Sequence, residues 1–226
     1  MTERSDRRTF LKRTTFVGLG LFTTPLLRAD ELPTPPQTEG PFFPVKPQAD
    51  RDLDLTRVEG RSGQAKGDIV VVRLQVLDRA GEPVGGAVVD LWQACASGRY
   101  ANPRDPNPAP LDPDFQGWAH AATDARGEIR LRTIIPGAYP ASRGWMRPPH
   151  IHFRVDAWDN KTRLTTQMYF KGQELNEADL ILRDTLRSFG WAAHDSLIVD
   201  FDRERTEDGK PLGTFRIVLG QTPEAH

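Results

Sequence analysis

The chain has 226 residues, which is enough for one sizeable domain with an N-terminal appendage. Its 30 Lys and Arg residues almost balance its 31 Asp and Glu residues, so the chain lacks the basic charge typical of a nucleic-acid-binding protein, and we expect no nucleic-acid partner. The single cysteine, Cys95, excludes an internal disulfide and a cysteine-cluster metal site, and we expect it to be a small buried side chain.

Residues 1–29 have the pattern of a targeting segment. The run RRTFLK at residues 7–12 matches the twin-arginine export signal R-R-x-F-L-K, and an uncharged, moderately apolar run follows at residues 14–27. That run is too short for a comfortable transmembrane helix. We therefore expect export through the twin-arginine pathway to the periplasm or outside of a bacterium, with no stable membrane span after processing. A disordered basic tail is the alternative.

Residues 30–68 are rich in proline and predict an extended arm. Within them the run TEGPFFP at residues 38–44 carries two adjacent aromatic rings, Phe42 and Phe43, which we expect to pack on a core. The globular pattern begins at Ile69, so residues 69–226 are predicted to form the one folded domain. All the candidate catalytic residues described below lie in this domain.

Eight runs from Ile69 onward predict β-strands, because they alternate apolar with polar residues or are rich in β-branched residues. Short strands with turns at regular spacing favour an all-β fold, a β-sandwich of about eight strands with long loops. The predicted strands are Ile69–Leu77, Ala87–Trp92, Trp118–Thr123, Glu128–Ile135, Ile151–Trp158, Leu164–Phe170, Ser196–Phe201 and Thr214–Leu219.

One short helix is predicted, over Glu177–Phe189. Apolar residues recur there at helical spacing, Asn176 can cap the first turn, and Gly190 can end the last.

The most informative stretch lies at residues 136–153, PGAYPASRGWMRPPHIHF. His150 and His152 are two residues apart, so on a strand both imidazoles face the same side. Tyr139 lies upstream in a Pro-Gly turn, and Tyr100 ends the run ASGRY. A free phenol has a pKa of about 10, and Fe(III) displaces its proton far more readily than divalent ions do. Phenols together with imidazoles therefore indicate a ferric site rather than a zinc site.

Each of these residues also has a purely structural interpretation. A His-x-His pair on a strand is often only packing or surface, and a tyrosine after Pro-Gly can simply fill a turn. Arg147 before two prolines can be a solvated charge. The combination is more specific than its parts.

Several runs resemble the signatures of the intradiol ring-cleavage dioxygenases, especially the protocatechuate 3,4-dioxygenase branch. The resemblance covers roughly residues 33–220 in the family's order. Its runs are TEGPFFP at 38–44, DLWQA at 90–94 leading to GRY at 98–100, TIIPGAYP at 133–140, RPPHIHF at 147–153 and TQMYF at 166–170.

The resemblance implies one non-haem Fe(III) ion per chain, since the family's four ligand positions are filled by Tyr100, Tyr139, His150 and His152. It also implies that Tyr139 accepts a proton from the substrate, so that this residue is catalytic as well as a ligand.

The resemblance further places Arg147 beside the bound substrate as a catalytic cation, and Gln167 in the same pocket as a substrate-binding residue. The chain departs from the family at Ala141, where an aromatic residue often follows Tyr-Pro, and Met146 displaces Trp145 by one position. Both departures concern the substrate pocket rather than the metal ligands.

The implied activity is cleavage of a catechol-type ring by O₂ to a cis,cis-muconate-type product. The candidates are catechol, protocatechuate, hydroxyquinol and their chlorinated or lignin-derived relatives. The chain lacks the long helical N-terminal segment of catechol 1,2-dioxygenases, which favours the protocatechuate-like branch. A homo- or hetero-oligomer, in which a partner completes the pocket, is left open.

Two other interpretations fit parts of the sequence. A cupin-type metalloprotein is suggested by Gly144, His150 and His152 followed by Asp156, but a cupin requires Glu at that point and a second histidine-bearing half. A non-catalytic transthyretin-like or carboxypeptidase-regulatory-like binding module is suggested by the turns at residues 81–87 and 123–127. The four ligand-type residues in family order favour the enzyme.

Overall fold

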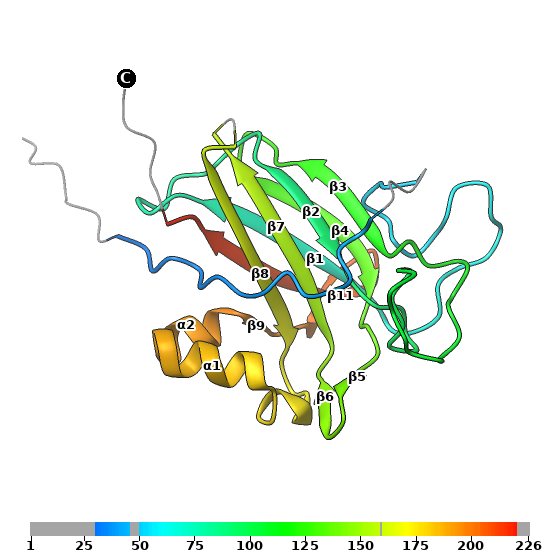
Figure 1. Cartoon of the computed structure of the whole chain (residues 1–226). Coiled ribbons are helices and arrows are strands. Elements are labelled where there is room, and N and C mark those ends of the chain that lie inside the picture. Colours follow the sequence, from blue (N-terminus) through cyan, green and yellow to red (C-terminus); the bar gives the residue numbers. More distant parts are fainter. Residues whose placement is uncertain (1–29, 46–49, 159, 221–226) are drawn as a thin grey trace, which may run out of the picture.

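The structure is a computed structural model that describes residues 30–45, 50–158 and 160–220 (Figure 1). The twin-arginine segment lies outside the described residues, so export stays a prediction. No helix among the described residues is long and apolar enough to cross a membrane.

Two β-sheets and one hairpin make up the domain, and the predicted all-β sandwich is confirmed. The first sheet has the order β10–β11–β1–β4 and the second the order β3–β2–β7–β8–β9, while β5 and β6 form the hairpin. The strands of the first sheet are β1 (Ile69–Leu77), β4 (Glu128–Ile134), β10 (Asp202–Glu207) and β11 (Lys210–Val218).

The second sheet carries most of the candidate site residues. Its strands are β2 (Val88–Trp92), β3 (Trp118–Ala122), β7 (His150–Ala157), β8 (Thr162–Phe170) and β9 (Ile198–Val199). The hairpin strands are β5 (Tyr139–Ser142) and β6 (Trp145–Arg147).

The core lies between the sheets, where alternate residues of the central strands face each other. Ile151, Phe153 and Val155 of β7 are completely buried, and Phe153 packs on Phe215 of β11 with 5.2 Å between ring centroids. Because side chains alternate along a strand, burying this row turns His150 and His152 to the opposite face of β7.

Three strands were not predicted from the sequence: β5, β6 and β10. The hairpin strands have only 4 and 3 residues, too short for a periodic pattern. The predicted strand at Ser196–Phe201 shortens to β9, because the preceding residues form the helix α2 (Trp191–Ser196).

The prediction of a single helix starting at Glu177 is wrong in the number of helices and in the starting residue. The structure has a 3₁₀-helix, η1 (Glu174–Asn176), and two α-helices, α1 (Leu180–Phe189) and α2. Asn176 does not cap α1. Asp179 does, because its side chain accepts hydrogen bonds from the backbone N–H groups of Ile181 and Leu182.

Residues 30–40 of the predicted arm are extended and cross β8 toward β7 in Figure 1, whereas residues 50–68 contain several turns. The backbone N–H of Gln37 donates to the carbonyl of Thr165 at 2.8 Å, and the Thr166 hydroxyl donates to the carbonyl of Pro35 at 2.9 Å. These bonds bring the following arm residues to the end of the second sheet where the candidate site lies.

Truncation of the central core ring tests the packing of the two sheets. We expect Phe153→Ala to lower the free energy of unfolding by about 3–5 kcal/mol, because a buried phenylalanine leaves a cavity. Phe189→Ala, at a ring 52% exposed, should cost much less. Equal losses in urea unfolding of the two variants would contradict the assigned core.

Candidate active site

Four rings meet at one end of the second sheet. Tyr100 lies in the loop after β2, Tyr139 begins β5, and His150 and His152 begin β7. The ring centroids of Tyr100 and Tyr139 are 5.4 Å apart, those of Tyr139 and His150 5.6 Å, and those of the two histidines 4.9 Å. The structure thus brings together all four side chains that the sequence analysis selected as metal ligands.

The backbone segments that lead to Tyr100 and Tyr139 contact each other at two glycines, Gly98 and Gly137. The carbonyl oxygen of Cys95 accepts from the N–H of Gly98 at 2.9 Å and of Gly137 at 3.1 Å. A Cβ atom on Gly137 would lie 2.4 Å from the carbonyl oxygen of Ala96, which is sterically impossible without movement. The two glycines therefore hold the Tyr100 and Tyr139 loops together.

Each histidine is oriented differently. The Nδ1 atom of His150 lies 2.7 Å from the carbonyl oxygen of Pro148, which can only accept, so Nδ1 carries the proton and Nε2 presents its lone pair. This Nε2 atom is 3.3 Å from the Tyr100 hydroxyl. His152 instead stacks on Trp92, with 4.8 Å between ring centroids and 7° between planes, and its Nδ1 atom has no hydrogen-bond partner in the described part of the chain.

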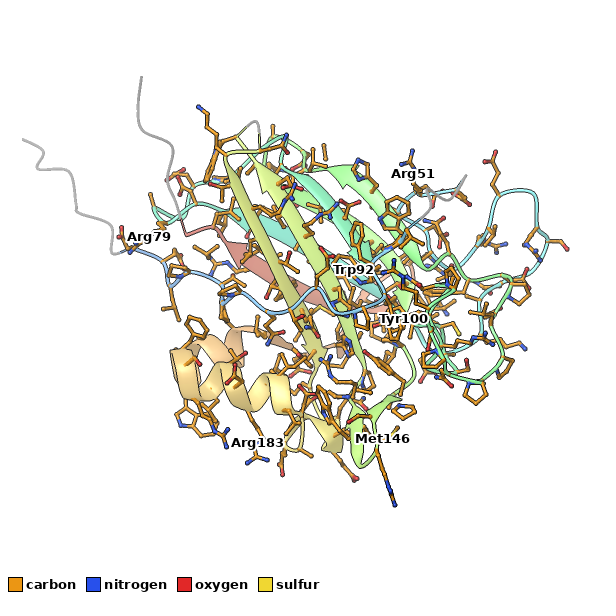
Figure 2. All side chains as sticks on the ribbon, viewed as in Figure 1. Arg51, Arg79, Trp92, Tyr100, Met146 and Arg183 are labelled. Carbon is orange, nitrogen blue, oxygen red and sulfur yellow. The ribbon has the colours of Figure 1, made fainter. Side chains whose placement is uncertain are left out.

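An aromatic wall closes the side of the site nearest the arm. Phe42 lies 4.9 Å from the Tyr100 ring, and Phe43 lies 4.9 Å from the Trp92 ring. Figure 2 shows Trp92 and Tyr100 at the same side of the molecule, with Met146 farther away on the hairpin. The predicted packing of both arm rings is confirmed, and it reduces the access of water to the ligand atoms.

Burial keeps the four rings uncharged in the absence of a metal. It raises the pKa of the Tyr100 phenol well above its ordinary value and raises the pKa of Tyr139 as well. Burial, and next the charge of Arg147, hold the pKa of His150 and of His152 well below the usual range. Neutral imidazoles are ready to bind a metal, whereas the phenols need a strongly charged cation to give up their protons.

Arg147 provides the cation next to this cluster. It is the register partner of Tyr139 in the β5–β6 hairpin and is only 3% exposed. Its Nε atom donates to Asp179 at 2.7 Å, and its Nη2 atom donates to Gln167 at 2.7 Å and to the Tyr169 hydroxyl at 3.1 Å. Arg147 is therefore a fixed, buried charge and not a solvated one.

Comparison with known proteins shows which family shares this sequence and fold. A family described as Dioxygenase matches residues 38–221. The chain is 42% identical over 183 residues to the protocatechuate 3,4-dioxygenase beta chain of Burkholderia cepacia, an alignment that covers 79% of this chain and 76% of that one.

The chain belongs to the intradiol ring-cleavage dioxygenase family. The predicted enzyme class is thereby confirmed.

Solved structures agree. The dioxygenase domain of a dioxygenase carbohydrate-binding protein fusion from Streptomyces sp. SirexAA-E superposes with a TM-score of 0.60 at 31% identity, covering 83% of this chain and 97% of that one. The 3-chlorocatechol 1,2-dioxygenase of Rhodococcus opacus 1CP shares the fold, with a TM-score of 0.63 at 23% identity over 87% of this chain and 75% of that one. Alignments with some other relatives cover only about half of the relative's length. For the chlorocatechol 1,2-dioxygenase of a Pseudomonas strain, the share covered is 47%.

The donor set fits the iron that the family resemblance implies. No three His, Cys, Asp or Glu residues cluster as a metal site within the described ranges, and the two histidines are accompanied by tyrosines instead. Two phenols and two neutral imidazoles offer two potential negative charges and two neutral donors, a combination suited to a trivalent ion. The binding of iron itself stays a prediction.

Gln167 lies behind Arg147 rather than free in a pocket. It is the register partner of His152, is completely buried, and accepts from Arg147 while its Nε2 atom donates to the Thr38 carbonyl at 3.1 Å. Its predicted contact with substrate stays a prediction, but its contact with Arg147 is direct.

Two site residues went unrecognised in the sequence analysis. Tyr169 was part of a quoted motif, but its hydrogen bond to Arg147 depends on the register of β8. Asp179 is also a typical N-cap residue, but the sequence analysis placed the helix cap at Asn176, three residues earlier. The remaining described histidines serve elsewhere: His120 contacts Asp90 at 2.8 Å, and His194 contacts its neighbour Asp195 at 2.7 Å.

Glycine substitution tests the loop contact. Gly137→Ala should reduce iron affinity about tenfold or more, as expected when support around a ligand is lost, because the added methyl group displaces the loop that carries Tyr139. Gly220→Ala is the matched control, since a Cβ there meets nothing within 4 Å. Competition with a chelator measures the affinity, and parental affinity in Gly137→Ala would refute the steric role.

The buried histidines predict a pH dependence of the metal-free protein. Their pKa is well below the ordinary value in the folded state, so below about pH 6.5 the unfolded chain binds more protons than the folded chain. Stability should therefore fall as the pH is lowered through this range.

Urea unfolding between about pH 7.5 and pH 5.5 measures this effect. In the double variant His150→Gln, His152→Gln the free energy of unfolding should depend less steeply on pH. The same slope in parent and variant would show that the two imidazoles are not responsible.

Proposed function

We propose that the protein is an Fe(III)-dependent intradiol dioxygenase that cleaves a catechol-type ring with O₂ to a cis,cis-muconate-type product. The observation that carries the proposal is the convergence of two phenols and two neutral imidazoles beside a buried arginine. Tyr100, Tyr139, His150 and His152 would hold one ferric ion per chain.

The bound ion would supply Lewis-acid activation of the catechol and a route for its reaction with O₂. The reaction balances without another reactant. The bond between the two hydroxyl-bearing carbons breaks, and these carbons become two new carboxyl groups, each with one atom from O₂. The chain's own residues would bind and orient the catechol, manage its protons and exclude water.

Proton transfer falls to Tyr139. A catechol that binds through both oxygens loses two hydroxyl protons. A solvent hydroxide in the site would accept one, and Tyr139 would accept the other. Although burial raises the pKa of Tyr139, the charge of Arg147 acts in the opposite direction. Because the pKa of Tyr139 is raised overall, a phenolate at this position would take up a proton readily.

Charge stabilisation falls to Arg147. During ring cleavage, negative charge develops on the substrate oxygens and on the ring carbon under attack. A fixed cation in a site with little water stabilises such charge without having to reorient. The aromatic wall of Phe42, Phe43 and Trp92 strengthens this effect because it limits water beside the charge.

Several features limit the substrate. The wall and the buried ligand rings favour a flat aromatic ring, and the relatives are named for protocatechuate, catechol, chlorocatechol and hydroxyquinol. The 42% identity to the beta chain of a protocatechuate 3,4-dioxygenase supports that branch as the first to assay.

Product analysis with labelled oxygen tests the proposal. The iron-loaded protein, supplied with protocatechuate, catechol and hydroxyquinol in turn, should consume one O₂ per ring and place one ¹⁸O atom in each of the two new carboxyl groups of a muconate. Incorporation of a single labelled atom, an aldehyde product from cleavage beside the hydroxyls, or no turnover on the whole panel would contradict it.

Tyr139→Phe tests the proton acceptor. The variant should keep much of its iron, through the other three ligands, but bind the catechol more slowly because the second proton has no acceptor. Stopped-flow mixing without oxygen measures the binding rate. Equal rates in variant and parent would refute the role of Tyr139.

A further inference from the structure

The guanidinium of Arg147 is clamped on two of its three nitrogens. Of its five N–H groups, the Nε group and the two on Nη2 point at Asp179, Gln167 and Tyr169. The third nitrogen, Nη1, makes no hydrogen bond to any of the described residues. It is not fully buried, so it remains accessible to a ligand. The clamp therefore fixes the plane of the guanidinium and leaves one donor edge unused.

Asp179 is the charged member of this clamp. It is 0% exposed, and its two carboxylate oxygens do different work. One oxygen, Oδ2, accepts from the Arg147 Nε atom at 2.7 Å. The other, Oδ1, accepts from the backbone N–H groups of Ile181 at 3.1 Å and Leu182 at 2.9 Å, which caps α1.

The other members of the clamp are neutral. The amide of Gln167 and the phenol of Tyr169 can each accept one N–H of Nη2, but they cannot compensate the charge of a buried cation. Tyr169 is in turn tied to the arm, because its hydroxyl donates to Gln37 at 3.1 Å, and Gln37 donates to Thr185 of α1 at 2.8 Å. Only Asp179 provides a formal negative charge among the hydrogen-bond partners of Arg147 in the described chain.

A charge that is buried without a partner is costly, and a pair with good geometry compensates that cost. The N-terminus of α1 also stabilises the Asp179 carboxylate, since the exposed N–H groups of a helix start favour an anion. Asp179 is therefore held in place by ten residues of helix, and it holds the arginine in turn.

We propose that Asp179 is the positioning residue of the active site: it links the start of α1 to Arg147 and fixes the guanidinium with the Nη1 edge directed at the substrate. The catalytic consequence rests on the proposed function, whereas the link between Asp179 and Arg147 does not. The hydrogen bonds of Asp179 go to Arg147 and to the start of α1, so its positioning effect passes through Arg147, while its charge adds to the effect of burial in raising the pKa of Tyr139.

Asp179→Asn separates the two roles of this residue. Asparagine is as good an N-cap as aspartate, so α1 keeps its first turn. With its oxygen on the cap, the asparagine amide group faces the Arg147 Nε–H, and two donors then oppose each other. The matched control is Asp184→Asn, which removes the same charge from an exposed position on the same helix.

The kinetic test uses the iron-loaded full chain and the best ring substrate of the panel. Asp179→Asn should lower kcat by about 10–100-fold, as misplacement of a catalytic group by about an ångström does, while KM, iron content and the visible spectrum stay close to parental. Asp184→Asn should match the parent in all four. A parental kcat in Asp179→Asn would overturn the proposal, as would a loss confined to iron content.

The second test needs neither iron nor turnover. In the metal-free parent, the Arg147 Nε–H should give an NMR signal that exchanges slowly with water, assigned by its absence in Arg147→Lys. The signal should disappear or exchange rapidly in Asp179→Asn and persist in Asp184→Asn. Rapid exchange in the parent would overturn the proposal without any variant.

This second test distinguishes the two proposals. A protein inactive on every catechol, but with the protected signal lost only in Asp179→Asn, would refute the proposed function and support the positioning role. If Asp179→Asn fails to fold, Asp179→Ser takes its place, because serine also caps a helix but is too short to reach Arg147.

Discussion

The register of three neighbouring strands is the constraint on which the site depends. In the second sheet, Trp92 of β2, His152 of β7 and Gln167 of β8 are direct cross-strand partners. A shift of one residue would turn both histidines of β7 into the core and bring Ile151 and Phe153 out of it. The same packing that buries the apolar row of β7 therefore presents its imidazoles to the tyrosine loops.

Burial gives these residues their chemical character. The four rings stay neutral without a metal, and Arg147 and Asp179 form a buried ion pair beside them. Such a set of donors can compensate the charge of a trivalent cation, because the two phenols can each lose a proton when they bind it. The arm contributes by covering the site, so Phe42 and Thr38 belong to it although they lie far from it in the sequence.

Much of the fold could be predicted from the sequence, because long buried strands have a strong pattern. The prediction for Ile69–Leu77 matches β1, and the two histidines were placed correctly on one face of β7. The hairpin strands were missed because β6 has 3 residues, and the start of α1 was misplaced because two capping residues, Asn176 and Asp179, compete in the sequence. Propensity cannot decide between them, whereas the buried ion pair with Arg147 does.

The site residues divide in the same way. Tyr100, Tyr139, His150 and His152 stand in recognisable runs, so their types and order sufficed to select them. The support around Arg147 comes instead from β8, the arm and α1, and no spacing in the sequence shows that these segments meet. Contacts set by tertiary packing between distant segments are what a pattern in one sequence leaves out.

The most direct measurement is the visible absorption spectrum of the iron-loaded protein, before and after catechol is added without oxygen. Phenolate ligation of Fe(III) predicts a broad visible band that shifts when catechol binds. The band should weaken in Tyr100→Phe, whose phenol lies 3.3 Å from His150, and persist in Tyr169→Phe. A protein that stays colourless after careful loading with iron would contradict the tyrosine–histidine iron site.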